Sequence, residues 1–304
     1  MTGGHASPEG TARYAARFPA LAGAGFYRPA VGLNVASLGM GTYLGNADET
    51  TDRGYTEAAL AALEGGINWF DTAINYRQMR SERALGVALA RFGRREEVGV
   101  STKAGFLTPG AVPDFLRAED VAGGVHSMAP DFLADQVERS RANLGLDTID
   151  VLYLHNPETQ LRFVSRALFE DRLRAAFDRL EELAGCGRIR WYGTATWDGY
   201  REPGQLELDR IVQIATAAGG PGHRFRFIQI PFNMAMTEGR PAFEEAARLG
   251  IAGVASATLL QGRLLRQAGA AEAIRFTRET PGVSVALVGM SSTAHVAANL
   301  GALA

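Results

Sequence analysis

The sequence predicts an α/β protein, a (β/α)8 TIM barrel with an N-terminal extension and a hairpin. Short apolar runs alternate with amphipathic stretches whose apolar residues recur at intervals of three and four. Eight such units follow one another, and strands that alternate with helices form right-handed βαβ units around a parallel sheet. Glycines stand where left-handed helix C-caps would fall, at Gly65-Gly66, Gly145, Gly187, Gly219-Gly220 and Gly250.

The elements are expected in the following order. Residues 1–25 form an extension with one helical turn around Ala12–Phe18, and residues 26–304 form a single barrel domain that opens with a hairpin over residues 27–35. The eight strands are expected at Val35–Gly41, Ile67–Asp71, Val98–Lys103, Ile149–His155, Ile189–Thr194, Phe225–Ile230, Ile251–Ser256 and Val283–Val288. The helices are expected at Asp52–Glu64, Ser81–Phe92, Asp131–Leu144, Phe169–Ala184, Leu206–Ala218, Ala242–Leu249, Ala270–Glu279 and Thr293–Leu300.

Composition excludes several classes of protein. With 46% hydrophobic and 21% charged residues, the chain resembles an average globular protein rather than a disordered one. The 31 basic and 33 acidic residues nearly balance, so neither nucleic acid nor an anionic membrane surface is an expected partner. No apolar run approaches the length of a transmembrane helix. The single cysteine, Cys186, suits a reducing, cytoplasmic location, and no metal-ligand spacing occurs around the histidines.

Four polar residues fall at or just after the carboxyl ends of three successive strands. Strand two ends in Asp71 and is followed by Tyr76, strand three ends in Lys103, and strand four ends in His155. These strand ends form one rim of a barrel, where chemistry is expected. An ammonium beside a phenol favours the phenolate and makes the phenol a better proton donor, and a carboxylate can hold that ammonium in place. The set suits proton donation to a carbonyl oxygen, with the hydride supplied by a nicotinamide cofactor.

The chain resembles the aldo-keto reductases. The resemblance rests on the stretches Gly39-Met40-Gly41-Thr42, Asn68-Trp69-Phe70-Asp71-Thr72-Ala73 to Tyr76, Ser81-Glu82-Arg83-Ala84-Leu85-Gly86, Ser101-Thr102-Lys103, Asp150 to His155, Gly187-Arg188-Ile189-Arg190, Ile228 to Asn233 and Asn299-Leu300-Gly301. They occur in the family's order from about residue 27 onward. The resemblance implies NAD(P)H-dependent carbonyl reduction, with Tyr76 as the general acid, Lys103 and Asp71 as its tuners and His155 as the residue that orients the substrate.

The resemblance also implies a cofactor site. It comprises Gly41, Thr42 and Asp71 near the nicotinamide ribose, Thr196 and Gln229 at the carboxamide, Ser256, Gln261 and Gly262 at the pyrophosphate, and Gly289, Met290, Ser291, Ser292, His295 and Asn299 at the adenosine end. Three features depart from the family pattern. Ala195-Thr196 replaces a Ser-Asn pair, Ala255-Ser256-Ala257 offers no aromatic residue to stack on the nicotinamide, and His295 is the one basic residue near the expected 2′-phosphate. NADPH is the expected cofactor, with NADH as the alternative.

The substrate is expected to be a small carbonyl compound whose identity the sequence does not specify. Five residues that follow or end strands are candidates for the pocket wall: Tyr43, Phe106, Asn156, Trp197 and Phe232. The 104–130 segment follows strand three, so it is expected to project from the same rim. Because the printed sequence ends at Ala304, soon after Asn299, we expect an open, permissive pocket mouth.

Two other functions fit parts of the pattern. One is a nucleotide-binding regulatory protein resembling the potassium-channel β subunits, with little turnover, which the altered contacts at Ala195 and on strand seven favour. The other is a barrel of different chemistry, such as a metal-dependent hydrolase or an aldolase, in which Lys103 forms a Schiff base with substrate. Aldehyde-dependent oxidation of a nicotinamide cofactor, nucleotide binding without turnover, and borohydride trapping on Lys103 distinguish the three.

Overall fold

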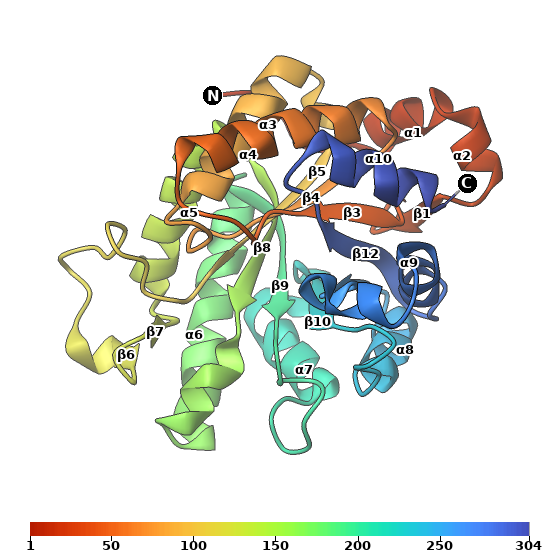
Figure 1. Ribbon diagram of the computed structural model, residues 1–304. Coiled ribbons are helices and arrows are strands. Elements are labelled where there is room, and N and C mark those ends of the chain that lie inside the picture. Colours follow the sequence, from red (N-terminus) through yellow and green to blue (C-terminus); the bar gives the residue numbers. More distant parts are fainter. Residues whose placement is uncertain (304) are drawn as a thin grey trace.

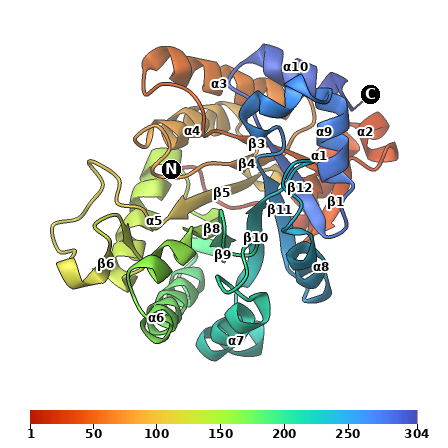
Figure 2. The same cartoon turned by 60° about the horizontal axis from the view of Figure 1, so that its bottom comes forward.

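The computed structural model describes residues 1–303 and shows a closed parallel barrel (Figures 1 and 2). The eight barrel strands, in their order around it, are β3 (Leu38–Gly41), β4 (Trp69–Asp71), β5 (Gly99–Ala104), β8 (Ile149–His155), β9 (Ile189–Ala195), β10 (Phe225–Pro231), β11 (Ala252–Ser256) and β12 (Val283–Gly289). The predicted (β/α)8 barrel is therefore confirmed. Ala304, the last residue of the expected domain, lies outside the described residues.

Helices surround the barrel, as Figure 2 shows. They are α3 (Glu49–Glu64), α4 (Arg80–Phe92), α5 (Pro130–Leu144), α6 (Arg166–Gly185), α7 (Leu208–Gly219), α8 (Arg240–Arg248), α9 (Ala270–Arg278) and α10 (Thr293–Gly301). One hydrophobic core fills the space between strands and helices, and a second lies inside the barrel around Trp69, Tyr153 and Phe227. No helix among residues 1–303 is long and apolar enough to cross a membrane.

The N-terminal segment is more ordered than predicted. The single turn expected at Ala12–Phe18 is instead two helices, α1 (Pro8–Ala16) and α2 (Pro19–Gly23). Ser7 caps α1 by accepting a hydrogen bond from the Gly10 N–H at 2.9 Å, and Pro8 occupies the first helical position, where its missing N–H carries no penalty. The expected hairpin is present as β1 (Tyr27–Ala30) and β2 (Leu33–Ala36).

The expected first strand, Val35–Gly41, is divided in the structure. Residues up to Ala36 belong to the hairpin strand β2, and the barrel strand β3 begins at Leu38. Ser37 separates them because its N–H and its hydroxyl both donate to the carbonyl oxygen of Phe26, at 2.8 and 2.7 Å, instead of continuing either sheet. The hairpin thereby turns away from the barrel and covers the amino-terminal end of the strands.

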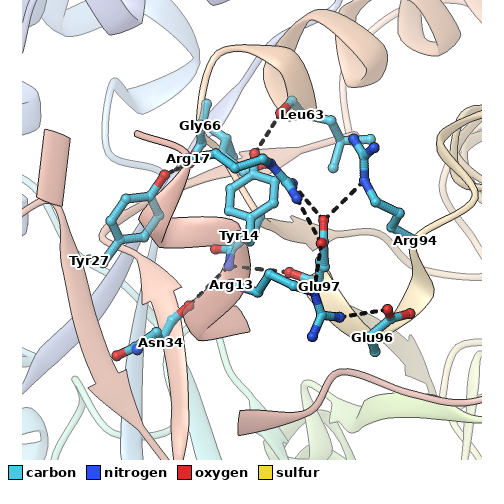
Figure 3. Close-up of polar contacts among 12 residues, drawn as sticks. Arg13, Tyr14, Arg17, Tyr27, Asn34, Leu63, Gly66, Arg94, Glu96 and Glu97 are labelled. Carbon is cyan, nitrogen blue, oxygen red and sulfur yellow. Dashed lines mark hydrogen bonds and ion pairs between the residues drawn. The ribbon is translucent and has the colours of Figure 1, made fainter. Parts of the chain in front are cut away.

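A buried carboxylate anchors α1 to the barrel (Figure 3). Glu97, in the 3₁₀ helix η1 (Arg95–Glu97), accepts two hydrogen bonds from the guanidinium of Arg17, at 2.7 and 2.5 Å, and one from Arg94 at 3.2 Å. Beside it, the Tyr14 hydroxyl donates to the carbonyl oxygen of Leu63 at 2.6 Å. At the same end, the Ala6 N–H donates to Asp150 at 2.8 Å. The N-terminal segment is therefore an integral part of this end of the barrel.

The long segment between β5 and α5 projects from the opposite end of the barrel (Figure 1). It contains two very short antiparallel strands, β6 (Val121–Ala122) and β7 (His126–Ser127). It returns to the barrel through backbone hydrogen bonds of Leu107 with Val125 (2.9 Å) and of Ser127 with Gly105 (2.8 Å). The segment is thus a folded-back flap beside the carboxyl ends of β5 and β8.

Candidate active site

Lys103 and Asp71 form a buried ion pair at the carboxyl end of the barrel. They lie on neighbouring strands, β5 and β4, and the Lys103 Nζ is 2.5 Å from Asp71 Oδ2 and 2.8 Å from the carbonyl oxygen of Thr72. Their side chains are 1% and 5% exposed. Burial alone would lower the pKa of Lys103, but the charge of Asp71 and the neighbouring Tyr76 raise it above its ordinary value, so the lysine stays an ammonium.

Asp71 is held by neutral donors as well. Its Oδ1 accepts from the Ser101 hydroxyl and from the Gln229 side-chain amide, each at 2.8 Å. Thr42 donates to the backbone carbonyl oxygen of Asp71 at 3.1 Å. Gln229 was expected to contact a nicotinamide carboxamide. In the structure its amide nitrogen is directed at Asp71, so its carbonyl oxygen is the atom left to contact a ligand.

Tyr76 and His155 lie close to this ion pair. Lys103 Nζ is 4.8 Å from the centroid of the Tyr76 ring, and the Tyr76 and His155 rings are 5.9 Å apart and nearly perpendicular. Burial raises the pKa of Tyr76, while Lys103 acts in the opposite direction. Lys103 therefore favours the phenolate, as expected, while desolvation opposes ionisation of the phenol as long as no ligand is bound. Burial and the charge of Lys103 keep the pKa of His155 well below its usual range, so the imidazole is neutral.

A cavity of about 640 Å3 opens beside these residues. Three of the expected wall residues line it, namely Phe106, Asn156 and Trp197. Tyr43 does not line it but packs its exposed ring 5.0 Å from that of Tyr76. The expectation for Phe232 is wrong: its ring is fully buried against those of Phe243 and Phe276, at 5.6 and 5.8 Å. Gln229 lies on β10 and binds Asp71, whereas Phe232 follows the last residue of that strand, Pro231, and packs in the core between strands and helices.

Glu158, which no sequence motif identifies, also lines the cavity. It lies in the 3₁₀ helix η3 (Pro157–Arg162) directly after β8. Its Oε1 accepts from the backbone N–H groups of Trp197, Asp198 and Gly199 at 2.8, 3.1 and 3.2 Å, and burial raises its pKa. Glu158 therefore fixes the loop that carries Trp197. Its position three residues after a barrel strand was the one sequence signal that could have identified it.

The opposite side of the rim fits an extended nucleotide cofactor. Gly41 and Gly289 are paired in register on β3 and β12, and a Cβ at either would make only ordinary van der Waals contacts, at 3.8 Å or more, so neither glycine is tightly enclosed. Thr196 and Thr258 carry buried hydroxyls without a hydrogen-bond partner among residues 1–303. Leu260 and Gln261 have left-handed φ angles of 47° and 55° where η5 (Leu260–Arg266) begins, a strain typical of ligand-binding loops.

The residues expected at the adenosine end differ in their accessibility. Ser292 caps α10 by accepting from the His295 N–H at 3.2 Å, and the Ser291 N–H donates to His295 Nδ1 at 3.3 Å. Asn299 lies on α10 and is 6% exposed. Met290, in contrast, is fully buried in the core, and its N–H is directed at the Gly41 carbonyl oxygen at 3.5 Å. Met290 is thus a supporting core residue, contrary to the expectation that it contacts cofactor. Ser256 ends β11 on the same rim and is partly exposed, followed by the kink at Gln261 and Gly262.

Comparison with known proteins gives a consistent assignment. The model of the Aldo/keto reductase family matches residues 37–272. A D-threo-aldose 1-dehydrogenase from a Pseudomonas species is 31% identical over 268 residues, which cover 82% of this chain and 71% of that protein. A putative voltage-gated potassium channel subunit beta from Schizosaccharomyces pombe is 26% identical over 61% of this chain, but only 47% of that protein is matched. The structure of an aldo/keto reductase from Klebsiella pneumoniae, in complex with NADP and acetate, has a TM-score of 0.64 at 19% identity and covers 89% of this chain and 87% of that chain.

Proposed function

The chain belongs to the aldo/keto reductase family, and we propose that it interconverts a carbonyl group and an alcohol, with Tyr76 as the proton donor. Family membership makes it an NAD(P)-dependent oxidoreductase. The observation that carries the proposal is the convergence of a phenol, an ammonium, a carboxylate and a neutral imidazole on one rim of the barrel. We also propose a cytoplasmic location, which the single cysteine supports.

Each of the four residues has a different role in the reaction at the carbonyl oxygen. Tyr76 donates its proton to that oxygen, and the Lys103 ammonium stabilises the phenolate that forms. Asp71 holds the ammonium in place by its 2.5 Å contact with Nζ. His155, being neutral, has one ring N–H with which to orient the oxygen. A bound nicotinamide cofactor supplies the hydride for reduction and accepts it in the reverse direction.

The raised pKa of Tyr76 has a functional reading. In the absence of ligand the phenol stays protonated, because burial opposes its ionisation. The proton is therefore retained on the oxygen until a neighbouring atom acquires negative charge. An oxyanion that develops on the substrate would accept it, while Lys103 compensates the charge left on Tyr76.

The substrate class that we propose is a polyhydroxylated aldehyde or aldose. The first observation that supports this class is the cavity wall, which combines polar groups of Asn75, Asn156 and Glu158 with the exposed indole of Trp197. Sugars present hydroxyls for such polar groups and C–H faces for such rings. The second observation is the similarity of the chain to a D-threo-aldose 1-dehydrogenase. A panel of aldoses and matched aliphatic aldehydes of equal length tests this: higher kcat/KM for aldoses is expected, and preference for the aliphatic members would refute it.

For the cofactor we propose NADPH, with NADH as the alternative. The likeness to a reductase solved with NADP supports the first, while the presence of His295 rather than arginine or lysine at the start of α10 keeps the second open. Residues proposed to hold it include Gly41, Thr196 and Gln229. Fluorescence titration with both nucleotides distinguishes the two, because a 2′-phosphate site gives a lower Kd for NADPH.

Replacement of the phenol tests the proposed function directly. Tyr76→Phe should lower kcat for reduction by at least about 100-fold, the usual contribution of a general acid, and should leave the Kd for the nucleotide unchanged. Tyr43→Phe is the matched control, since Tyr43 packs beside Tyr76 but is not one of the four residues proposed to act on the carbonyl oxygen. Equal activity of Tyr76→Phe and the wild type would refute the assignment.

A second candidate is a nucleotide-binding regulatory protein with slight turnover. Similarity to a potassium channel subunit beta favours it, as does the replacement of the usual strand-five pair by Ala195-Thr196. Tight nucleotide binding without turnover across the whole carbonyl panel would support this function over the first.

A further inference from the structure

The flap between β5 and α5 meets the active-site rim at a buried histidine outside the proposed catalytic set. His126 lies on β7 and is fully buried, and its Nε2 is 2.8 Å from the backbone carbonyl oxygen of His155. A carbonyl oxygen can only accept a hydrogen bond, so Nε2 must carry the proton. His126 therefore binds the last residue of β8, the same residue whose ring faces Tyr76.

The other ring nitrogen of His126 is also engaged. Arg172 on α6 donates to Gln160 Oε1 at 2.9 Å, and because arginine has no acceptor, this contact fixes the orientation of the Gln160 amide. The Gln160 Nε2 then donates to His126 Nδ1 at 3.2 Å. Burial lowers the pKa of His126 to about 4, which keeps the ring neutral. The series of hydrogen bonds from Arg172 through Gln160 and His126 to His155 thus permits one tautomer of His126.

The packing around His126 reaches the ring of His155 as well. The Phe106 ring packs against both imidazoles, 5.2 Å from that of His126 and 5.1 Å from that of His155, and is nearly perpendicular to both. Gly105 makes this approach possible, because a Cβ there would lie 2.6 Å from His126 Nε2. Both the backbone and the ring of His155 are therefore supported from the flap.

We propose that His126 is a positioning residue for His155: its hydrogen bond to the His155 carbonyl oxygen, held by Gln160 and Arg172, fixes the imidazole over the substrate. The inference rests on the proposed function. It assigns a role to the flap, because the flap carries His126 and Phe106 to the rim. Misplacement of a substrate-orienting group by about 1 Å can lower a rate by about 100-fold.

Two substitutions separate the hydrogen bond from simple packing. His126→Gln places an amide N–H near the position of Nε2, whereas His126→Phe fills the same space without a donor. We expect His126→Phe to lower kcat about 10- to 100-fold with little change in nucleotide Kd, and His126→Gln to recover most of it. The control is His223→Gln, a buried histidine near the start of β10, at the other end of the barrel, which should keep wild-type kcat. Equal loss in the Phe and Gln variants would overturn the proposal.

A double-mutant cycle shows whether His126 acts through His155. In a His155→Gln background, His126→Phe should cause almost no further loss of kcat, because the group that it positions is gone. Multiplicative losses would show an independent structural role and would overturn the proposal. Should His126→Phe fail to fold, Gln160→Met replaces it, since that variant removes the donor to Nδ1 and should lower kcat in the same direction.

One measurement does not depend on turnover. Nitrogen-15 spectra of the imidazoles should show shifted His155 ring signals in His126→Phe and wild-type signals in His126→Gln. Unshifted His155 signals in His126→Phe would overturn the proposal even in an inactive protein. Shifted signals together with a wild type that reduces no carbonyl would instead overturn the proposed function alone.

Discussion

Removal of the ammonium from the buried Lys103–Asp71 pair should destabilise the protein strongly. Lys103→Met leaves the Asp71 carboxylate with two neutral donors, Ser101 and Gln229, in a site that is 5% exposed. Breaking a buried ion pair by removing one partner costs about 3–5 kcal/mol, mostly because the remaining charge is uncompensated. Asp71→Asn should cost a similar amount, because the buried Lys103 ammonium would lose the negative charge that compensates it.

The double variant Asp71→Asn, Lys103→Met decides whether this reasoning is right. It contains no buried charge at the site, so its free energy of unfolding should exceed the additive expectation by at least about 2 kcal/mol. Urea unfolding at pH 7.5, monitored by tryptophan fluorescence and circular dichroism, gives the free energy of unfolding of the wild type, the two single variants and the double variant. All three variants should be inactive, so stability alone is decisive.

An exposed ion pair supplies the control. Arg91 and Glu57 are 3.0 Å apart with side chains 56% and 60% exposed, so Arg91→Met should change the free energy of unfolding by less than about 1 kcal/mol. If the Asp71 and Lys103 substitutions are additive, the pair contributes no more than its separate groups and the electrostatic argument for this site is refuted.

Two further predictions concern stability. A Cβ at Gly193 on β9 would lie 2.0 Å from the carbonyl oxygen of Phe227. Gly193→Ala should therefore lower the free energy of unfolding in urea by about 3 kcal/mol, whereas Gly185→Ala, which has open space around its Cβ, should not lower it. Equal stability of the two variants would contradict the close approach at Gly193. His126 takes up a proton near pH 6.5 in the unfolded chain but only near pH 4 in the folded chain. The free energy of unfolding should therefore fall by about 3 kcal/mol as the pH falls from 6.5 to 4. In His126→Gln the free energy of unfolding should fall less between pH 6.5 and pH 4 than in the wild type. An unchanged dependence on pH would refute this prediction.

The barrel and the position of its reactive residues could be predicted from sequence. Periodicity locates the barrel strands, except that it does not separate the first of them from the hairpin at Ser37. The carboxyl ends of parallel strands share one rim, so Asp71, Lys103 and His155 had to lie near one another. Local signals also existed for features that were missed. Ser7-Pro8 is a helix start, because the serine can cap the helix and the proline suits its first position.

Other features depend on contacts that no local pattern encodes. The strands β6 and β7 have two residues each, too few for any periodicity, so His126 could not be placed against His155 from sequence. The pKa of Tyr76 depends on a balance between desolvation and the charge of Lys103, and only the folded structure gives the burial that decides it. The turn of the Gln229 amide toward Asp71 is likewise a tertiary contact.

The docking of residues 2–7 has a consequence for biosynthesis. Thr2 pairs with Leu146, Ala6 donates to Asp150, and the carbonyl oxygen of Ala6 accepts from Arg190. A polypeptide leaves the ribosome with its first residues foremost. Residues 2–7 therefore leave the ribosome before the strands that bind them, and their docking is complete only after β9, which carries Arg190, has been synthesised.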